Sequence, residues 1–337
     1  MGGSYEGCKR IHTVPKPSSD ARYSLVAPFS FSPGGSLVSS VLDDGEIGTC
    51  ATAQYLEDDW YGKLLGEEFN RVALKNDLIW KNVHPQRDTF EFGPADRLIN
   101  FAECHGMTVT GHAFVWHIEN PDWLVKRDWS SEALANELRS HIHTLTDRYA
   151  DRVDTWDVEK EAVNDLGKLR ETLRLEHLGE EYIVDAFRWA ADHIDADLYY
   201  DEYGLTVNKP KQDKVYDVLS NLLDKGVPVD GLGLQFHCVG VHPTPEQIEV
   251  TIRRFQELGI NVRVTALDTA CKLPALKGGA FTMDSRSNQR WCGFKSALVQ
   301  RPGVYTHAYA CVSVRRLVQP TEEFETGVLR RVVVGVK

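Results

Sequence analysis

The sequence predicts an α/β protein with a (β/α)8 barrel fold, and three observations carry that prediction. Eight strand-like apolar segments alternate with helix-like amphipathic segments along the chain. No Gly-x-Gly-x-x-Gly turn follows any of the strand-like segments, which disfavours the main alternative, an open doubly wound sheet. Hydrophobic residues make up 42% of the 337-residue chain, which is enough for a large core. We therefore expect a TIM barrel.

The first half of the chain contains four of the expected strand–helix units. Residues 1–35 are rich in Pro, Ser and Gly and are expected to form a loose lead-in, followed by a single domain over residues 36–337. Ser130 is expected to cap a helix whose apolar residues recur at helical spacing. Strands are expected at residues 47–53, 71–74, 107–114 and 153–158, and further helices at 58–69 and 94–104.

The second half of the chain repeats the pattern. Thr244, Pro245 and Gln247 together predict a helix start, because they supply a capping hydroxyl, a proline at the first helical position and a glutamine at the third. Helices are expected at residues 180–193, 211–223, 245–258 and 289–299, and strands at 198–200, 231–237, 262–267 and 304–311.

Composition and charge exclude several classes of partner. The formal net charge of -11 disfavours nucleic acid and anionic membrane surfaces, and no apolar run is long enough to span a bilayer. The first residues lack the apolar core of a signal peptide, and the seven scattered cysteines form no C-x-x-C motif. We expect a cytoplasmic protein with reduced thiols that binds a small molecule and uses no metal or other cofactor.

Polar residues gather where the expected strands end, and in a barrel these ends meet at one mouth. Glu161 is the first candidate for a working acid or base, because charged groups are rarely crowded at the end of a buried strand. The alternative is a salt-bridged strand end that faces water, and the local sequence does not decide between the two. The other polar residues at strand ends are Asn76, His112, Trp116, His117, Lys160, Glu202, Tyr203, Gln235, His237 and Asp268.

Several segments resemble the motifs of one enzyme family, in the same order along the chain. Gly111–His117 is close to G-H-T-L-V-W-H, and Trp156–Ala162 resembles W-D-V-V-N-E-A, whose Glu is the general acid/base. Gln235–His237 resembles Q-S-H, and Val264–Asp268 resembles I-T-E-L-D, whose Glu is the nucleophile. Over residues 36–300 the chain thus resembles glycoside hydrolase family 10, the endo-1,4-β-xylanases. This resemblance implies a (β/α)8 barrel, and it implies that Glu161 is the acid/base.

The departures from the family pattern bear on function. A retaining glycosidase needs two carboxylates about 5–5.5 Å apart, but Ala266 stands where the resemblance places the nucleophile. Asp268, two residues further on, is expected to be a structural carboxylate rather than a substitute. Lys160 replaces the asparagine that precedes the acid/base, and Lys75 and Ile79 replace the family's sugar-binding Glu and Lys. The segment around residues 304–309 also lacks the family's W-G-x-x-D pattern.

Two functions of different kinds fit these residues. The first is a repurposed enzyme that performs acid/base chemistry on a small cytosolic metabolite, such as cyclisation, isomerisation or elimination, with Glu161 as the acid/base. The second is a pseudoenzyme that binds a carbohydrate or a partner. A Schiff base on Lys160 is a third and less favoured interpretation. The expected catalytic residues are Glu161, His237 and Lys160. The expected substrate contacts are Asn76, Trp80, His112, Trp116, His117, Tyr203, Gln235, Ala266 and Asp268.

Overall fold

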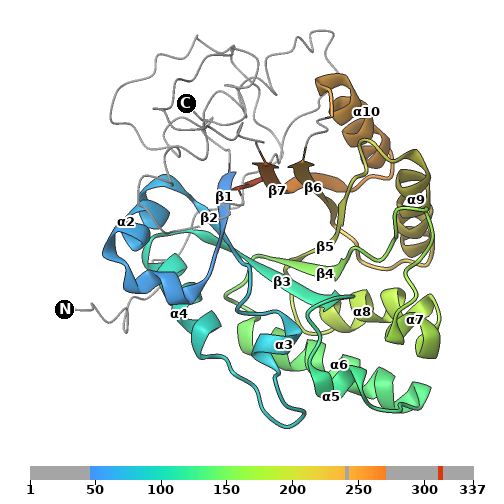
Figure 1. Ribbon diagram of the computed structural model, residues 1–337, viewed down its shortest axis with the longest axis horizontal. Coiled ribbons are helices and arrows are strands. Elements are labelled where there is room, and N and C mark those ends of the chain that lie inside the picture. Colours follow the sequence, from blue (N-terminus) through green and yellow to red (C-terminus); the bar gives the residue numbers. More distant parts are fainter. Residues whose placement is uncertain (1–45, 240–242, 271–309, 314–337) are drawn as a thin grey trace, which may run out of the picture.

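A ring of β-strands surrounded by helices forms the body of the molecule (Figure 1). The computed structural model describes residues 46–239, 243–270 and 310–313. The strands are β1 (Glu46–Ala51), β2 (Arg71–Leu74), β3 (Thr108–Trp116), β4 (Thr155–Lys160), β5 (Asp197–Tyr203), β6 (Gly231–Val239), β7 (Asn261–Ala270) and β8 (Ala310–Ser313). Strands β1 to β7 pair side by side in chain order and are all parallel.

Helices follow each of the strands β1 to β6 and pack on the outside of the ring. They are η1 (Ala53–Glu57), α2 (Asp59–Glu68), α3 (Trp80–Val83), α4 (Gly93–Cys104), α5 (Asp122–Val125), α6 (Ser131–Tyr149), α7 (Leu173–Leu178), α8 (Glu181–Ala191), α9 (Lys209–Asp224) and α10 (Pro245–Gln256). This alternation confirms the arrangement that the sequence predicts, and it buries both faces of the parallel sheet.

The predicted caps are present at two helices. The Ser130 side chain accepts a hydrogen bond from the backbone N–H of Ala133 at the start of α6. Thr244 and Gln247 form a reciprocal capping box at the start of α10, with Pro245 in the first turn. Each of these contacts satisfies a backbone N–H that has no partner within its helix. The sequence signals for these two helix starts are therefore confirmed.

The last strand differs from the expectation. The predicted strand at 304–311 lies mostly outside the described residues, as do the lead-in at 1–35 and the predicted helix at 289–299. The described part, β8, pairs antiparallel with β1, with Glu46 opposite Ser313 and Thr49 opposite Ala310. It also lies beside β7, at the other end of the strand order. An apolar segment predicts a strand but not its direction, which depends on the connections around it.

Buried polar residues close the barrel interior below its mouth. Arg71 is 2% exposed and forms an ion pair with Glu46 at 2.7 Å. The Arg71 guanidinium also donates hydrogen bonds to the hydroxyls of Thr110 at 2.8 Å and Thr155 at 3.3 Å. Arg263 donates to the same Thr155 hydroxyl at 3.0 Å. These contacts satisfy most of the polar groups that fill this end of the barrel, although Arg263 Nη2 is buried without a hydrogen-bond partner.

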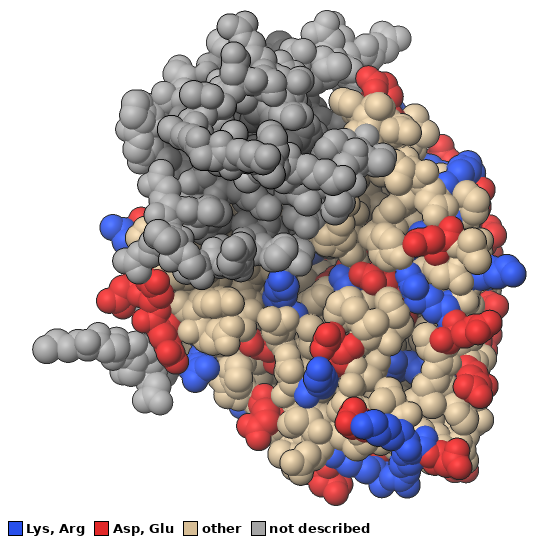
Figure 2. All heavy atoms as spheres, in the orientation of Figure 1, with Lys and Arg blue, Asp and Glu red and all other residues tan. Residues whose placement is uncertain are grey.

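The outer surface mixes charges of both signs. On the face seen in Figure 2, acidic and basic side chains alternate over the described residues and do not gather into one large basic area. Within the described ranges, the helices are all too short or too polar to cross a membrane.

Candidate active site

Glu161 is held in an unusual backbone conformation directly after β4. Its φ of 58° lies in the left-handed region that residues other than glycine rarely adopt. Two hydrogen bonds fix it: its N–H donates to the Asp201 carbonyl at 2.8 Å, and its carbonyl accepts from Arg170 Nε at 2.7 Å. Such strain costs of order 1–3 kcal/mol and is concentrated at functional sites, so the backbone itself marks Glu161 as a candidate.

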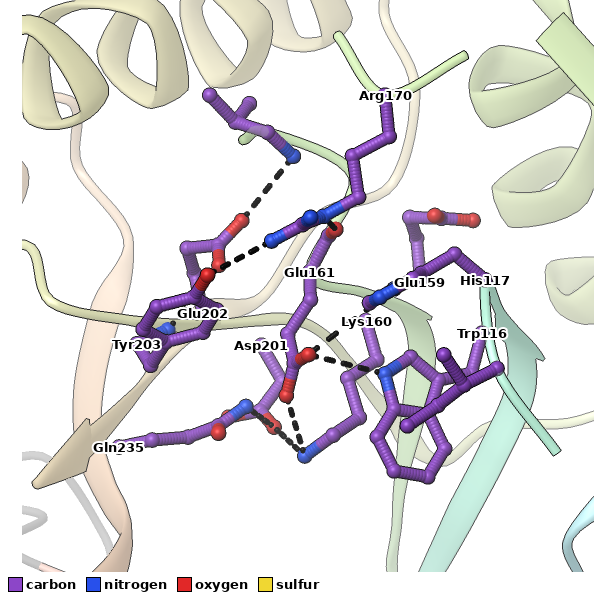
Figure 3. Close-up of polar contacts among 12 residues, drawn as sticks. Trp116, His117, Glu159, Lys160, Glu161, Arg170, Asp201, Glu202, Tyr203 and Gln235 are labelled. Atoms are coloured by element: carbon purple, nitrogen blue, oxygen red, sulfur yellow. Dashed lines mark hydrogen bonds and ion pairs between the residues drawn. The ribbon is translucent and has the colours of Figure 1, made fainter. Parts of the chain in front are cut away.

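The Glu161 carboxylate is held by groups from two adjacent strands (Figure 3). Trp116, at the end of β3, donates from Nε1 to Oε2 at 3.1 Å. The Lys160 ammonium lies 3.4 Å from Oε1, and His117 Nδ1 lies 4.0 Å from Oε2. Each carboxylate oxygen thus has a fixed neighbour, so the group is positioned as a proton-transferring group must be.

Lys160 is the centre of a buried charge network beneath Glu161. Its ammonium lies 3.0 Å from Asp201 Oδ2, the same oxygen that accepts from Gln235 Nε2 at 2.6 Å. The other Asp201 oxygen accepts from the Thr265 hydroxyl. Burial by itself lowers the pKa of Lys160, but the carboxylates of Asp201 and then Glu161 raise it above its ordinary value. The ammonium form is therefore strongly favoured, which disfavours Lys160 as a Schiff-base nucleophile.

Asp201 has the opposite shift. Burial alone raises the pKa of its carboxyl group, but Lys160 and then His112 hold that pKa below its ordinary value. Gly233 on the neighbouring strand β6 leaves the room for this arrangement, because a Cβ atom there would lie 2.3 Å from Asp201 Oδ1. The pair of Lys160 and Asp201 is therefore built into the floor of the site.

Strand register places Ala266 in the same group. Ala266 pairs with Gln235, which pairs with Tyr203, so the three residues lie on the inner face of adjacent parallel strands. A bulge between β6 and β7 shifts the register just before Gln235, and the inner-facing Thr265 is the additional residue. Ala266 presents only a methyl group, and no carboxylate arises from this position.

His237 lies at the open end of the site. Its side chain is exposed, and its Nε2 lies 2.9 Å from Gln235 Oε1. Tyr203 accepts a hydrogen bond from Arg170 at its hydroxyl, at 2.8 Å. Asp268 pairs with His237 in the backbone register of β6 and β7. His237, Tyr203 and Gln235 thus surround the end of the barrel at which Glu161 lies.

His112, Asp157 and Asp201 are the described residues with the geometry of a cation site. His112 Nδ1 lies 2.6 Å from Asp157 Oδ2, and ligand atoms of all three residues lie within 4.8 Å of one another. The sequence spacing does not reveal this grouping because the residues come from three strands. The Lys160 ammonium already supplies a positive charge 3.0 Å from Asp201, so the network does not need a metal ion for charge balance.

Two of the expected substrate contacts form their side-chain hydrogen bonds with residues outside this network. Trp80 is 3% exposed and stacks on His141 with ring centroids 3.8 Å apart. Its Nε1 donates to His84 Nδ1 at 3.2 Å, so its polar atom is already satisfied. Asn76 donates from Nδ2 to the Thr52 hydroxyl at 3.4 Å. Of the altered positions, Ile79 is buried and only 7% exposed, so it offers no polar contact to a sugar.

Sequence reasoning did not select Asp201 and Arg170, on which the site depends, and it named Glu202 only as a polar residue at a strand end. Asp201 directly follows an apolar strand segment, and its charge is opposite to that of Lys160. These two features of the sequence could have identified it as a site residue. Arg170 lies in a loop, and its position in the sequence gave no indication that it holds the Glu161 backbone. Glu202, buried behind the site, is paired with Lys211 at 2.9 Å, and burial raises its pKa to about 7. It supports the wall of the site rather than facing the mouth.

Together, the fold and the position of Glu161 define a barrel protein of the glycoside hydrolase type. Residues 36–304 match the profile of Glycosyl hydrolase family 10, and the chain belongs to that family. This membership confirms the resemblance and the (β/α)8 barrel.

The chain is similar to several xylanases. Endo-1,4-beta-xylanase B of Thermotoga neapolitana is 37% identical over 62% of this chain and 60% of its own length. A beta-1,4-xylanase of Dictyoglomus thermophilum is 39% identical over 65% of this chain and 62% of its own length. The matches thus span about three fifths of both relatives. The crystal structure of xylanase 10B from Thermotoga petrophila RKU-1 in complex with xylobiose is also similar, with a TM-score of 0.68 and 33% identity, covering 71% of this chain and 75% of that one.

Proposed function

We propose that the chain binds a small polyhydroxylated molecule in the barrel mouth and that Glu161 transfers protons to or from it, without a covalent glycosyl–enzyme intermediate. The observation that carries this proposal is a contrast between two positions. Glu161 is fixed through its backbone and through both carboxylate oxygens, whereas Ala266 has no nucleophilic atom. A retaining mechanism needs both carboxylates, but general acid/base catalysis needs only the first.

The groups that remain at the site can transfer protons, and this favours reactions that need only proton transfer. Cyclisation, isomerisation and elimination each require a proton to be moved at a fixed place, and one positioned group contributes about 10²–10⁴-fold to such a step. His237 is the second candidate for proton transfer, because its ring is exposed at the mouth and oriented by Gln235 at 2.9 Å. The xylanase names of the relatives support a ligand of carbohydrate type. The buried Ile79 and the lysine at position 160 support a ligand other than ordinary xylan.

The first experiment tests the missing covalent step. The protein is incubated with xylan and with an aryl xylobioside, and the configuration of any released sugar is followed by NMR. We expect no turnover by the retaining route. Release of sugar with retained configuration, at a normal enzymatic rate, would refute the proposal.

The second experiment tests proton transfer directly. A panel of reducing sugars, sugar lactones and sugar acids is incubated with the protein in D2O, and deuterium incorporation is followed by NMR. We expect incorporation into at least one compound, and we expect Glu161→Gln to abolish most of it while leaving the melting temperature nearly unchanged. Incorporation at the same rate in Glu161→Gln, or none with any compound, would contradict the proposed role of Glu161.

The second candidate function is saccharide binding without catalysis, and one contact favours it. The Lys160 ammonium lies 3.4 Å from Glu161 Oε1, so the carboxylate is already engaged in an ion pair. A similar structure, of an intracellular xylanase from Thermoanaerobacterium saccharolyticum with a glutamate replaced by alanine, was solved in complex with xylotetraose. Calorimetric titration with xylotetraose distinguishes the two functions. Saturable binding without deuterium incorporation into any compound would favour binding alone.

A further inference from the structure

A hollow of about 460 Å³ lies beside the barrel mouth, between the loop after β3 and the loop after β4. Arg170 and Arg174 line it, together with the neutral polar residues Asn164 and Thr172. Leu124 and other apolar side chains complete its lining. Sites for small molecules typically enclose about 300–1,000 Å³ and combine apolar walls with a few polar groups. The hollow has the size and the mixed lining of such a site.

Arg174 is the most buried charge in the lining and is incompletely satisfied. It is 3% exposed, and its guanidinium donates to the Trp116 carbonyl at 3.2 Å and to Asn120 Oδ1 at 2.8 Å. Its third nitrogen, Nε, is buried without a hydrogen-bond partner. In the described part of the chain, no carboxylate oxygen lies within 4.0 Å of this guanidinium. A buried charge normally has a counter-charge. The positive charge of Arg174 has none within this distance, so it is free to pair with an anionic group of a ligand.

Arg170 adds a second positive charge to the same hollow. Its guanidinium donates to the Glu161 carbonyl and to the Tyr203 hydroxyl, which are both uncharged oxygens. Among the described residues it also forms no ion pair with a carboxylate. Glu171, which lines the hollow too, is exposed to solvent, where water and salt screen its charge.

Glu159 is the buried acid that interacts most strongly with the Arg174 charge, but it does not neutralise that charge. Glu159 accepts a hydrogen bond from the Tyr182 hydroxyl at 3.1 Å through Oε1, and its Oε2 is buried without a partner. Burial raises the pKa of the Glu159 carboxyl group to about 8, more than Arg174 lowers it. At neutral pH this carboxyl group is mostly protonated, so it leaves the positive charge of Arg174 largely uncompensated.

We propose that this hollow binds a monosaccharide-sized carboxylate, a sugar acid, whose carboxylate pairs with Arg174 and Arg170. Guanidinium groups bind carboxylates with strong, directional hydrogen bonds. The Asn164 amide and the Thr172 hydroxyl offer partners for the hydroxyl groups of such a ligand, and the exposed Val125 offers an apolar contact for its carbon skeleton. The site shares Arg170 with the contacts that hold the Glu161 backbone, but it does not use the Glu161 carboxylate and does not depend on the proton transfer proposed for it.

The test is a calorimetric titration of the full chain with glucuronate, with glucose as the neutral counterpart. We expect saturable binding of glucuronate that weakens as salt is added. We expect glucose to bind roughly tenfold more weakly or worse, because it lacks the charge-assisted hydrogen bonds. Glu161→Gln should bind glucuronate as the unaltered chain does, which separates this site from the proposed active site.

Two variants locate the binding. Arg174→Gln removes the buried charge, and its melting temperature shows whether it still folds. Val125→Glu is the safer change, because Val125 lines the hollow and is 47% exposed. Val250→Glu, at a position on α10 that is 65% exposed, is its matched control. We expect Val125→Glu to weaken glucuronate binding several-fold and Val250→Glu to leave it unchanged.

Four outcomes would overturn the proposal. They are an absence of saturable glucuronate binding, equal affinity for glucose, binding of inorganic phosphate as tight as that of glucuronate, and unchanged affinity in Val125→Glu. If Arg174→Gln does not fold, the comparison between the two glutamate variants still decides.

Discussion

Replacing Lys160 with methionine should destabilise the protein strongly, because the change leaves a buried carboxylate without its counter-ion. The ammonium of Lys160 lies 3.0 Å from Asp201 and 3.4 Å from Glu161, and the side chains of Lys160 and Asp201 are 9% and 1% exposed. Removing one partner of a buried ion pair typically costs about 3–5 kcal/mol. Methionine has nearly the volume of lysine, so little of that cost comes from a cavity.

The structure also predicts how the loss is reversed. In Lys160→Met with Asp201→Asn, the unpaired charge is gone. The amide oxygen still accepts from Gln235, and the amide NH2 donates to the Thr265 hydroxyl, which turns to accept, so most of the lost stability should return. Lys126→Met is the matched control. Lys126 pairs with Asp122 on the surface, where the side chains are 71% and 79% exposed. An exposed pair of this kind contributes about 0–1 kcal/mol.

The assay is urea denaturation followed by circular dichroism at pH 6 to 8. The pKa of Lys160 is raised by folding, so its contribution is complete below the unfolded value of about 10.4 and is lost as pH rises through the folded pKa. The pKa of Asp201 is lowered, so its contribution is present above about 3.9 and is lost as pH falls through the folded pKa. The difference between the variants should therefore be flat over this range. A loss below about 1 kcal/mol in Lys160→Met, equal to that of a surface pair, would refute the reasoning.

Three further predictions concern single residues. Ala266→Glu alone should not yield a competent xylanase in a nitrophenol-release assay, because Lys160 would pair with the new carboxylate and the family's sugar contacts would still be missing; near-family rates would contradict this. As pH rises from about 5 to 8, Glu159→Gln should gain stability relative to the unaltered chain, by at most about 1.4 kcal/mol per pH unit. The reason is that the unaltered chain must release the Glu159 proton on unfolding in this range, whereas the variant has no such proton. Urea midpoints of the two proteins that change with pH in parallel would count against this prediction. Borohydride reduction with carbonyl compounds should add no mass at Lys160, since its ammonium is paired with two carboxylates, and a labelled peptide in mass spectrometry would show otherwise.

Most of the fold is readable from the sequence because local signals and the overall architecture agree. The strand at Arg71–Leu74 is predicted to the residue, and β6 begins at Gly231 as expected. Strands end later than their apolar runs suggest: β4 extends to Lys160 and β5 to Tyr203. Their last residues are charged or polar, and they pair because neighbouring strands supply partners that hydrophobicity does not record.

The sequence predicts which residues form the candidate site, but it does not predict how their side chains are arranged. Motif order identifies Glu161, Gln235 and Ala266, and strand ends bring them to one mouth. The bulges that shift the register beside Glu159 and Gln235 have no sequence signal, yet they decide which side chains face inward. The pairing of Lys160 with Asp201 joins residues 41 positions apart, so it becomes visible only once the two strands lie side by side.

The left-handed backbone at Glu161 has a consequence for how this position evolves. Glycine would adopt the same φ of 58° without strain, so the chain would gain stability by giving up the carboxylate. Two selective pressures therefore act in opposite directions at residue 161: selection for stability favours glycine, and selection for function keeps the acid. In a lineage that no longer used Glu161, only the selection for stability would remain, and it would favour glycine or asparagine at this position. The identity of residue 161 in close relatives that also carry alanine at position 266 is thus a natural record of whether the acid is still in use.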